Sequence, residues 1–133
     1  SIDRGQIEGG FIQGLGWLTR EELLYADDGV LKTHSPDTYK IPALSDAPLD
    51  FRVDLLDKAE ESSVIHGSKA VGEPPFLLAI AVLTALRHAI ASYHSDNQVE
   101  ALPIPCTPEA VLASIEVARG HLSADAALQR MRN

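Results

Sequence analysis

The feature of this sequence that most constrains its fold is a long apolar run behind two consecutive prolines. Residues 76–86 carry no charged side chain and follow directly after Pro74 and Pro75. Proline suits the first turn of a helix, because the N–H that it lacks has no intrahelical partner there. We therefore predict a helix that begins near Glu73, is apolar on every face up to Leu86, and lies at the centre of a core.

The segment before this helix, residues 67–75, carries the first candidate site. Lys69 and Glu73 flank small residues there, among them Val71 and Gly72. The free amides and the dipole at a helix start favour a carboxylate, so a simple helix cap explains Glu73. Glutamate is also the residue type needed for a base at the edge of an apolar core, with its proton affinity tuned for proton abstraction. The residues alone leave both interpretations open.

A second helix is predicted near the start of the chain, over residues 6–22. Its apolar side chains recur at three and four residues, which is helical spacing. Four glycines interrupt the pattern. Each costs up to about 1 kcal/mol relative to alanine, so the helix is expected to approach another backbone or a ligand closely. Gln6 and Gln13 lie two turns apart and could hydrogen-bond a planar heterocycle, or only nearby backbone groups.

Short apolar stretches between turn signals predict β-structure in the middle of the chain. Asp28 and Gly29 predict the turn of a hairpin over residues 21–35. Residues 51–56, where apolar and charged side chains alternate, and residues 63–66 are predicted strands. The predicted fold class is α+β, with helices packed on a small mixed or antiparallel sheet.

The last part of the chain is predicted to be helical. Thr107 and Pro108 predict the start of a helix that ends at Gly120, and a short helix follows over residues 123–131. We therefore divide the chain into residues 1–102 and a proline-linked helical tail, residues 103–133.

Composition limits the partners and the compartment. The 133 residues are enough for one core, and the net charge of −8 disfavours nucleic acid because it repels phosphate. The longest uncharged run, residues 74–86, is shorter than the roughly 20 residues that span a bilayer, so no membrane association is predicted. One cysteine, Cys106, excludes an internal disulfide and a four-thiolate metal site, and fits a cytoplasmic protein. The histidines lack helical metal-ligand spacing, so no metal ligand is predicted.

Three motifs occur in order along the chain. They are QIEGGFIQGLGW at residues 6–17, TYKIP at residues 38–42 and GSKAVGEPPF at residues 67–76. Together they resemble the C-terminal part of the molybdopterin-binding large subunit in the xanthine oxidase family of molybdenum hydroxylases, and in particular its xanthine dehydrogenases. The resemblance covers about residues 1–93, and it implies that the chain is a fragment of a larger molybdopterin-binding domain.

The resemblance implies a role for each matching residue. The family oxidises hypoxanthine and xanthine to urate, with water as the oxygen source. Glu73 matches the family's general base, which takes a proton from the molybdenum-bound hydroxyl. Gln6 matches a glutamine that hydrogen-bonds the molybdopterin cofactor. Val71 and Gly72 match backbone beside the open side of the metal, and Lys69 matches a motif lysine to which we assign a positioning role.

The resemblance also implies cofactors and partners beyond this chain. The molybdenum–molybdopterin site is only partly present here, and iron–sulfur clusters and FAD are expected in other domains or another subunit. The expected partners are the purine substrate, the rest of the large subunit and an iron–sulfur or flavin unit, in an oligomer. Two alternatives remain: an enzyme for aldehydes or other N-heterocycles, and a non-catalytic module in which Glu73 only caps a helix.

Overall fold

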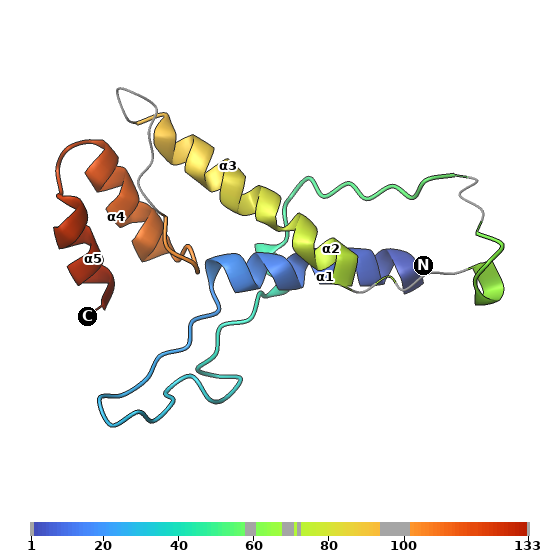
Figure 1. The fold of residues 1–133 in the computed structure, drawn as a ribbon, viewed down its shortest axis with the longest axis horizontal. Helices are drawn as coiled ribbons and strands as arrows, with labels where there is room; N and C mark the ends of the chain where they lie inside the picture. Colours follow the sequence, from blue (N-terminus) through green and yellow to red (C-terminus); the bar gives the residue numbers. More distant parts are fainter. Residues whose placement is uncertain (1, 58–60, 68–70, 72, 94–101, 133) are drawn as a thin grey trace.

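The computed structural model describes residues 2–57, 61–67, 71, 73–93 and 102–132. Figure 1 shows an elongated, largely helical molecule in which α2 runs beside α1, while α4 and α5 lie at the end away from the N-terminus. The described residues form α1 (Ile2–Thr19), η1 (Leu44–Asp46), η2 (Ile65–Gly67), α2 (Glu73–Leu78), α3 (Ile80–Ala91), α4 (Pro108–Ala118) and α5 (Ala124–Arg132), where η marks a short 3₁₀ helix.

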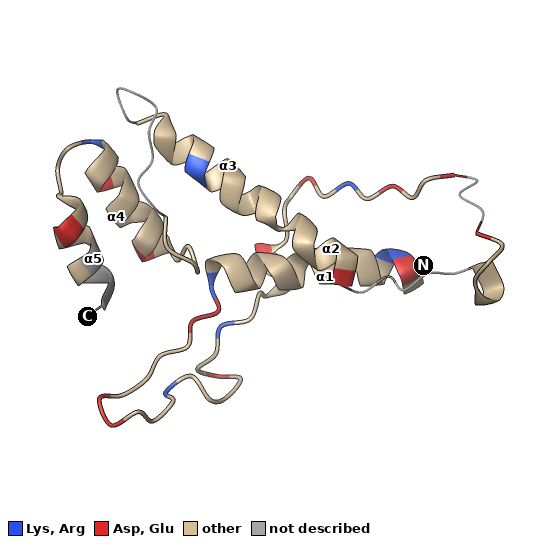
Figure 2. Ribbon diagram, in the orientation of Figure 1, with Lys and Arg blue, Asp and Glu red and all other residues tan. Residues whose placement is uncertain are grey.

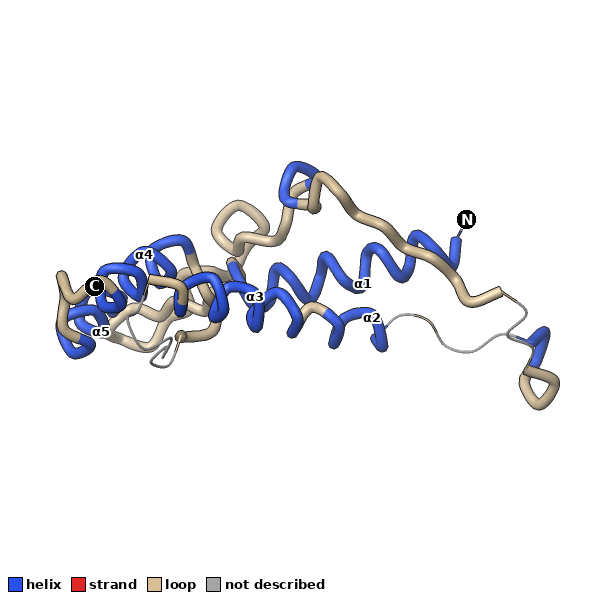
Figure 3. The backbone as a smooth tube through the Cα atoms, turned by 90° about the horizontal axis from the view of Figure 1, so that it is seen from above, coloured by secondary structure: helices blue, strands red, loops and turns tan. Residues whose placement is uncertain are grey.

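The predicted sheet is wrong, because the described residues form no β-strand. The turn at Gly29 is present, with φ +83°, but the predicted hairpin is reduced to one isolated antiparallel bridge between Tyr25 and Leu31. A lone two-stranded ribbon is marginally stable in water, and no third strand supports this one in the described part of the chain. The fold is therefore helical rather than α+β (Figure 3).

The other two predicted strands fail for different reasons. Residues 51–56 run without regular secondary structure, and Phe51 packs its ring against Phe11 of α1, with centroids 5.4 Å apart. Alternating side chains suit a strand, but a strand also needs a neighbour for its backbone groups. Residues 63–66 run into η2, where His66 has φ +56° and Gly67 has φ +64°. That left-handed backbone is incompatible with a strand.

The predicted apolar helix begins at Glu73, as expected, but it is divided into two. α2 ends at Leu78 and α3 begins at Ile80, with the fully buried Ala79 between them. The expectation that this stretch is central to a core holds only in part, because Leu77 and Leu78 are 59% and 63% exposed. Glu73–Ala91 as a whole is long and apolar enough to cross a bilayer by length and composition, a weak criterion that core helices of soluble proteins also meet.

A small core joins α3 to α4. Ile90, Leu102 and Cys106 form its buried centre, and partly buried apolar side chains of both helices pack around it. The predicted start of α4 is confirmed, because Thr107 Oγ1 accepts a hydrogen bond from the Ala110 N–H at 3.3 Å. This core is connected to α1 through the Cys106 N–H, which donates to the Leu18 carbonyl at 2.6 Å.

Candidate functional site

The site is built where α1 and α2 pack at close range. An ideal Cβ at Gly14 would lie 2.7 Å from the Cβ of Ala79 and closer still to the carbonyl oxygen of Phe76. A side chain at Gly14 would therefore hold the two helices apart. The rings of Trp17 and Phe76 stack beside this contact, with centroids 5.3 Å apart. This packing fixes where α2 begins relative to α1, and with it the position of Glu73.

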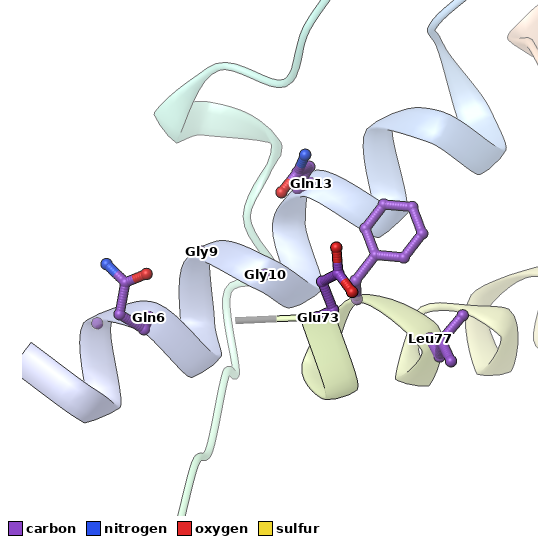
Figure 4. Close-up of a pocket in the computed structure, with 8 residues that line it drawn as sticks. Gln6, Gly9, Gly10, Gln13, Glu73 and Leu77 are labelled. Atoms are coloured by element: carbon purple, nitrogen blue, oxygen red, sulfur yellow. The ribbon is translucent and has the colours of Figure 1, made fainter. Parts of the chain in front are cut away.

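A pocket of about 580 Å³ opens between the two helices (Figure 4). Among the described residues that line it, Glu73 is the only charged one. α2 and α3 together carry one other Lys, Arg, Asp or Glu side chain, Arg87 (Figure 2). The described residues that line it are Gly5, Gln6, Gly9, Gly10 and Gln13 from α1, and Glu73, Phe76 and Leu77 from α2. One face of the first helix and the start of the second therefore meet at a common cavity.

The polar groups of this pocket are exposed and available to a ligand. Figure 4 shows the amides of Gln6 and Gln13 and the carboxylate of Glu73 projecting to the same side of the two helices. Within the part of the chain that the structure describes, none of these three side chains has a hydrogen-bond partner. Two amides that donate and accept, and one carboxylate that accepts, form a suitable set for a hydrogen-bonding heterocycle and a proton transfer.

The floor of the pocket is bare backbone. Among the residues that the structure describes, an ideal Cβ at Gly5 or at Gly9 would meet no heavy atom within 4 Å. The backbone of α1 is therefore open to close approach of a flat group, and side chains at these positions would fill the space.

The motif at residues 38–42 contacts the C-terminal end of α1 and the residues that follow it. The Tyr39 hydroxyl donates to Glu21 Oε2 at 2.6 Å, and this hydrogen bond raises the pKa of Tyr39 above its ordinary value. The ring of Pro42 occupies the space that a Cβ at Gly16 would need. These contacts bind the motif to the end of α1, so its role in this structure is to hold the helix in place.

The structure brings together two of the predicted site residues, Gln6 and Glu73, which are distant in the sequence. Val71 is half-buried and does not line the pocket. Lys69 and Gly72 lie outside the described residues. No cluster of three or more metal-ligating side chains occurs among the residues that are described.

Sequence reasoning missed three pocket residues, Gly5, Phe76 and Leu77. Gly5 lies four residues before Gly9, which places both on one helix face, and this spacing could have identified Gly5 from the sequence. Phe76 follows Glu73 by three residues on the next helix, which is again a same-face spacing. Its contact with Trp17, however, depends on tertiary packing that no local pattern indicates.

Comparison with known proteins gives a consistent result. Residues 1–48 match the family model of the molybdopterin cofactor-binding domain, so Gln6, Gly9 and Gln13 lie inside the matched segment and Glu73 lies outside it. The chain is 49% identical over 121 residues to a xanthine dehydrogenase of Oryza sativa and 47% identical over 116 residues to a xanthine dehydrogenase/oxidase of Rattus norvegicus. It is 41% identical over 119 residues to aldehyde oxidase 1 of Macaca fascicularis.

These alignments include most of this chain but little of each relative. They cover 84% of the chain for the rice and rat proteins and 87% for the macaque protein, and in each case 9% of the relative. The bare helix face and the hydrogen-bonding side chains of the pocket fit the cofactor that the matched domain binds. The chain is therefore similar, over most of its own length, to a small part of xanthine dehydrogenases, and its first helix lies in the segment that matches the molybdopterin cofactor-binding domain.

Proposed function

We propose that this chain supplies one wall of the molybdopterin site and the general base of a molybdenum hydroxylase. The complete protein would oxidise hypoxanthine and xanthine to urate, with water as the source of oxygen. The observation that carries the proposal is the pocket itself, in which Gln6 and Glu73 lie on two helices that pack against each other. The match of residues 1–48 to the cofactor-binding domain supports the cofactor part of this proposal, and Glu73 lies outside that match.

In this proposal, α1 binds and orients the cofactor. The Gln6 amide has no competing partner among the described residues, so it is free to donate to and accept from the edge of the pterin. The open backbone at Gly5 and Gly9 receives its flat face. When bound, the cofactor accepts the electron pair that leaves the substrate.

Glu73 acts as the base. A carboxylate oxygen of Glu73 accepts the proton of the water-derived oxygen as that oxygen attacks the purine carbon, so the nucleophile forms without a free hydroxide. The stacking of Trp17 on Phe76 and the close contact at Gly14 hold α2, and with it the backbone of Glu73, against α1. General-base assistance of this kind contributes about 10²–10⁴-fold to rate.

The remaining residues of the third motif have supporting roles in the proposal. Val71 and Gly72 provide backbone beside the reacting group, where a larger side chain at position 72 would crowd the substrate. Lys69 positions the segment. No side chain of this chain ligates the metal. Iron–sulfur clusters and FAD belong to other domains or another subunit, and the complete protein is proposed to be a cytoplasmic oligomer that binds neither nucleic acid nor membrane.

A second candidate function is the oxidation of aldehydes or of other N-heterocycles. The 41% identity to aldehyde oxidase 1 favours this alternative specifically. The two proposals share the cofactor and Glu73 and differ only in the substrate. Relative kcat/KM values of the full-length protein for xanthine, hypoxanthine and a set of aromatic aldehydes distinguish them.

The non-catalytic interpretation of Glu73 has little support from the geometry. A capping carboxylate accepts hydrogen bonds from amides of the first turn, but Pro74 and Pro75 have no N–H to donate, so Phe76 is the first residue whose amide could serve a cap. No hydrogen bond to the Glu73 carboxylate occurs among the described residues. Its position is therefore better explained by the pocket than by a cap.

The decisive experiment replaces Glu73 by Gln in the full-length protein. Glutamine keeps the shape of the side chain but cannot accept the proton as a base, so kcat should fall about 10²–10⁴-fold while molybdenum content stays at the wild-type level. Glu8→Gln is the matched control, because Glu8 lies on α1 outside the pocket and pairs with Arg4 at 2.9 Å. Near-normal turnover of Glu73→Gln would refute the proposed role.

A further inference from the structure

Four of the five glycines of α1 fall into two groups with different surroundings, and the fifth, Gly10, also lines the pocket. Gly14 and Gly16 are buried, and a Cβ at either would overlap Phe76, Ala79 or Pro42. The helical packing therefore requires them. Gly5 and Gly9 are exposed, and a Cβ at either would meet nothing within 4 Å.

Nothing in the described fold accounts for glycine at positions 5 and 9. Both lie inside α1 and neither has a positive φ, so alanine would fit the backbone without strain. Glycine is the less favourable choice in a helix interior, since it has more conformational freedom to lose on folding. An explanation must therefore come from something that approaches this face of α1 from outside.

The pocket indicates which group approaches Gly5 and Gly9. Gly5 and Gly9 both line it, and along α1 they lie on either side of Gln6 and before Gln13. Figure 4 shows Gly9 between Gln6 and Glu73, on the part of the floor nearer to Gln6. This is the end of the pocket assigned to the cofactor, because Gly9 lies within the segment that matches the cofactor-binding domain and Glu73 does not.

We propose that Gly9, together with Gly5, is a steric determinant of cofactor binding. The two residues leave the backbone of α1 bare so that the flat pterin can lie directly against it. A side chain at position 9 excludes the pterin while leaving the helix intact. This inference rests on the proposed function and concerns binding of the cofactor rather than the chemical step.

The test uses the full-length protein with Gly9→Ala and Gly9→Val. Three quantities are measured for each: molybdenum per protein by mass spectrometry, released pterin by fluorescence after oxidation, and helix content with thermal unfolding by circular dichroism. Asp3→Val is the matched control, because it adds the same branched side chain to α1 at an exposed position outside the pocket. None of these readouts depends on turnover.

We expect Gly9→Val to lose pterin and molybdenum together, about 10-fold or more, and Gly9→Ala to lose less. Because bound cofactor itself raises the unfolding temperature, the helix content and unfolding temperature are compared in cofactor-free protein, where they should be like those of cofactor-free Asp3→Val. Full cofactor content in Gly9→Val overturns the inference. So does a loss of helix content or stability in cofactor-free Gly9→Ala relative to cofactor-free wild-type protein, which would show that the glycine serves packing. Normal content with reduced kcat also overturns it, because position 9 would then face the substrate. A wild-type protein without molybdenum or pterin would instead contradict the proposed function.

Discussion

Replacing Gly14 by Ala should loosen the contact between α1 and α2. The new Cβ would lie 2.7 Å from the Cβ of Ala79, whereas ordinary contacts are 3.4–4 Å, so the helices must separate by about 1 Å. Overpacking of this kind costs about 1–3 kcal/mol, and the better helix propensity of alanine offsets up to about 1 kcal/mol of it. The expected net loss in local stability is about 1–2 kcal/mol.

Hydrogen–deuterium exchange of the full-length protein measures this loss directly. Amides of α1 and α2 should exchange about 5- to 30-fold faster in Gly14→Ala, because local opening becomes that much more frequent. Turnover per bound molybdenum should also fall, about 100-fold, since a shift of about 1 Å moves Glu73 away from its working position.

Asp3→Ala is the control for stability, because it changes an exposed residue of the same helix outside the pocket. It should leave exchange in α2 unchanged. If the amides of α2 exchanged no faster in Gly14→Ala than in Asp3→Ala, the close contact between the helices would not be what positions α2, and the reasoning would be wrong.

Two further predictions concern groups outside the pocket. Because the Tyr39 hydroxyl donates to Glu21, the phenol should ionise above its ordinary pKa of 10.0, so the contact stabilises the fold below that pH and is lost as the pH rises through the raised pKa. Tyr39→Phe should remove this late-titrating phenol from an ultraviolet titration and lower the free energy of unfolding by about 1 kcal/mol. A Tyr39 phenol that titrates at its ordinary pKa would contradict the contact. Burial raises the pKa of the Cys106 thiol, so iodoacetamide should modify Cys106 slowly near neutral pH and rapidly after denaturation, as measured by peptide mass spectrometry; rapid native modification would refute its burial.

Local signals in the sequence predicted the helices better than they predicted anything between them. The proline pair located the start of α2, Thr107 located the start of α4, and the glycines of α1 indicated a close approach that the structure shows at Gly14 and Gly16. Each of these signals acts through the backbone within a few residues or through a missing Cβ. These local signals therefore predict the same structure whatever packs against the segment.

The sheet was predicted wrongly because alternation describes a single strand and says nothing about its partner. Residues 51–56 have the right pattern but are placed by the contact of Phe51 with Phe11. Likewise, the uninterrupted apolar sequence gives no signal for the interruption between α2 and α3 at Ala79, because that interruption depends on the tight packing of Ala79 against Gly14.

The candidate site was predicted in part. The resemblance to a family pointed to Gln6 and Glu73, and the structure adds that they line one pocket together with Gln13 and the exposed Gly5 and Gly9. Phe76 could not have been found in this way, because its contribution is a ring contact with Trp17 across two helices.

The most direct measurement of the central claim is an experimental structure of the full-length protein with its molybdopterin bound. We predict that the pterin lies against Gly9, that the Gln6 amide is within hydrogen-bond distance of the pterin, and that the carboxylate of Glu73 faces the same bound group. A cofactor on another face of α1, or a Glu73 carboxylate directed into bulk solvent, would contradict it.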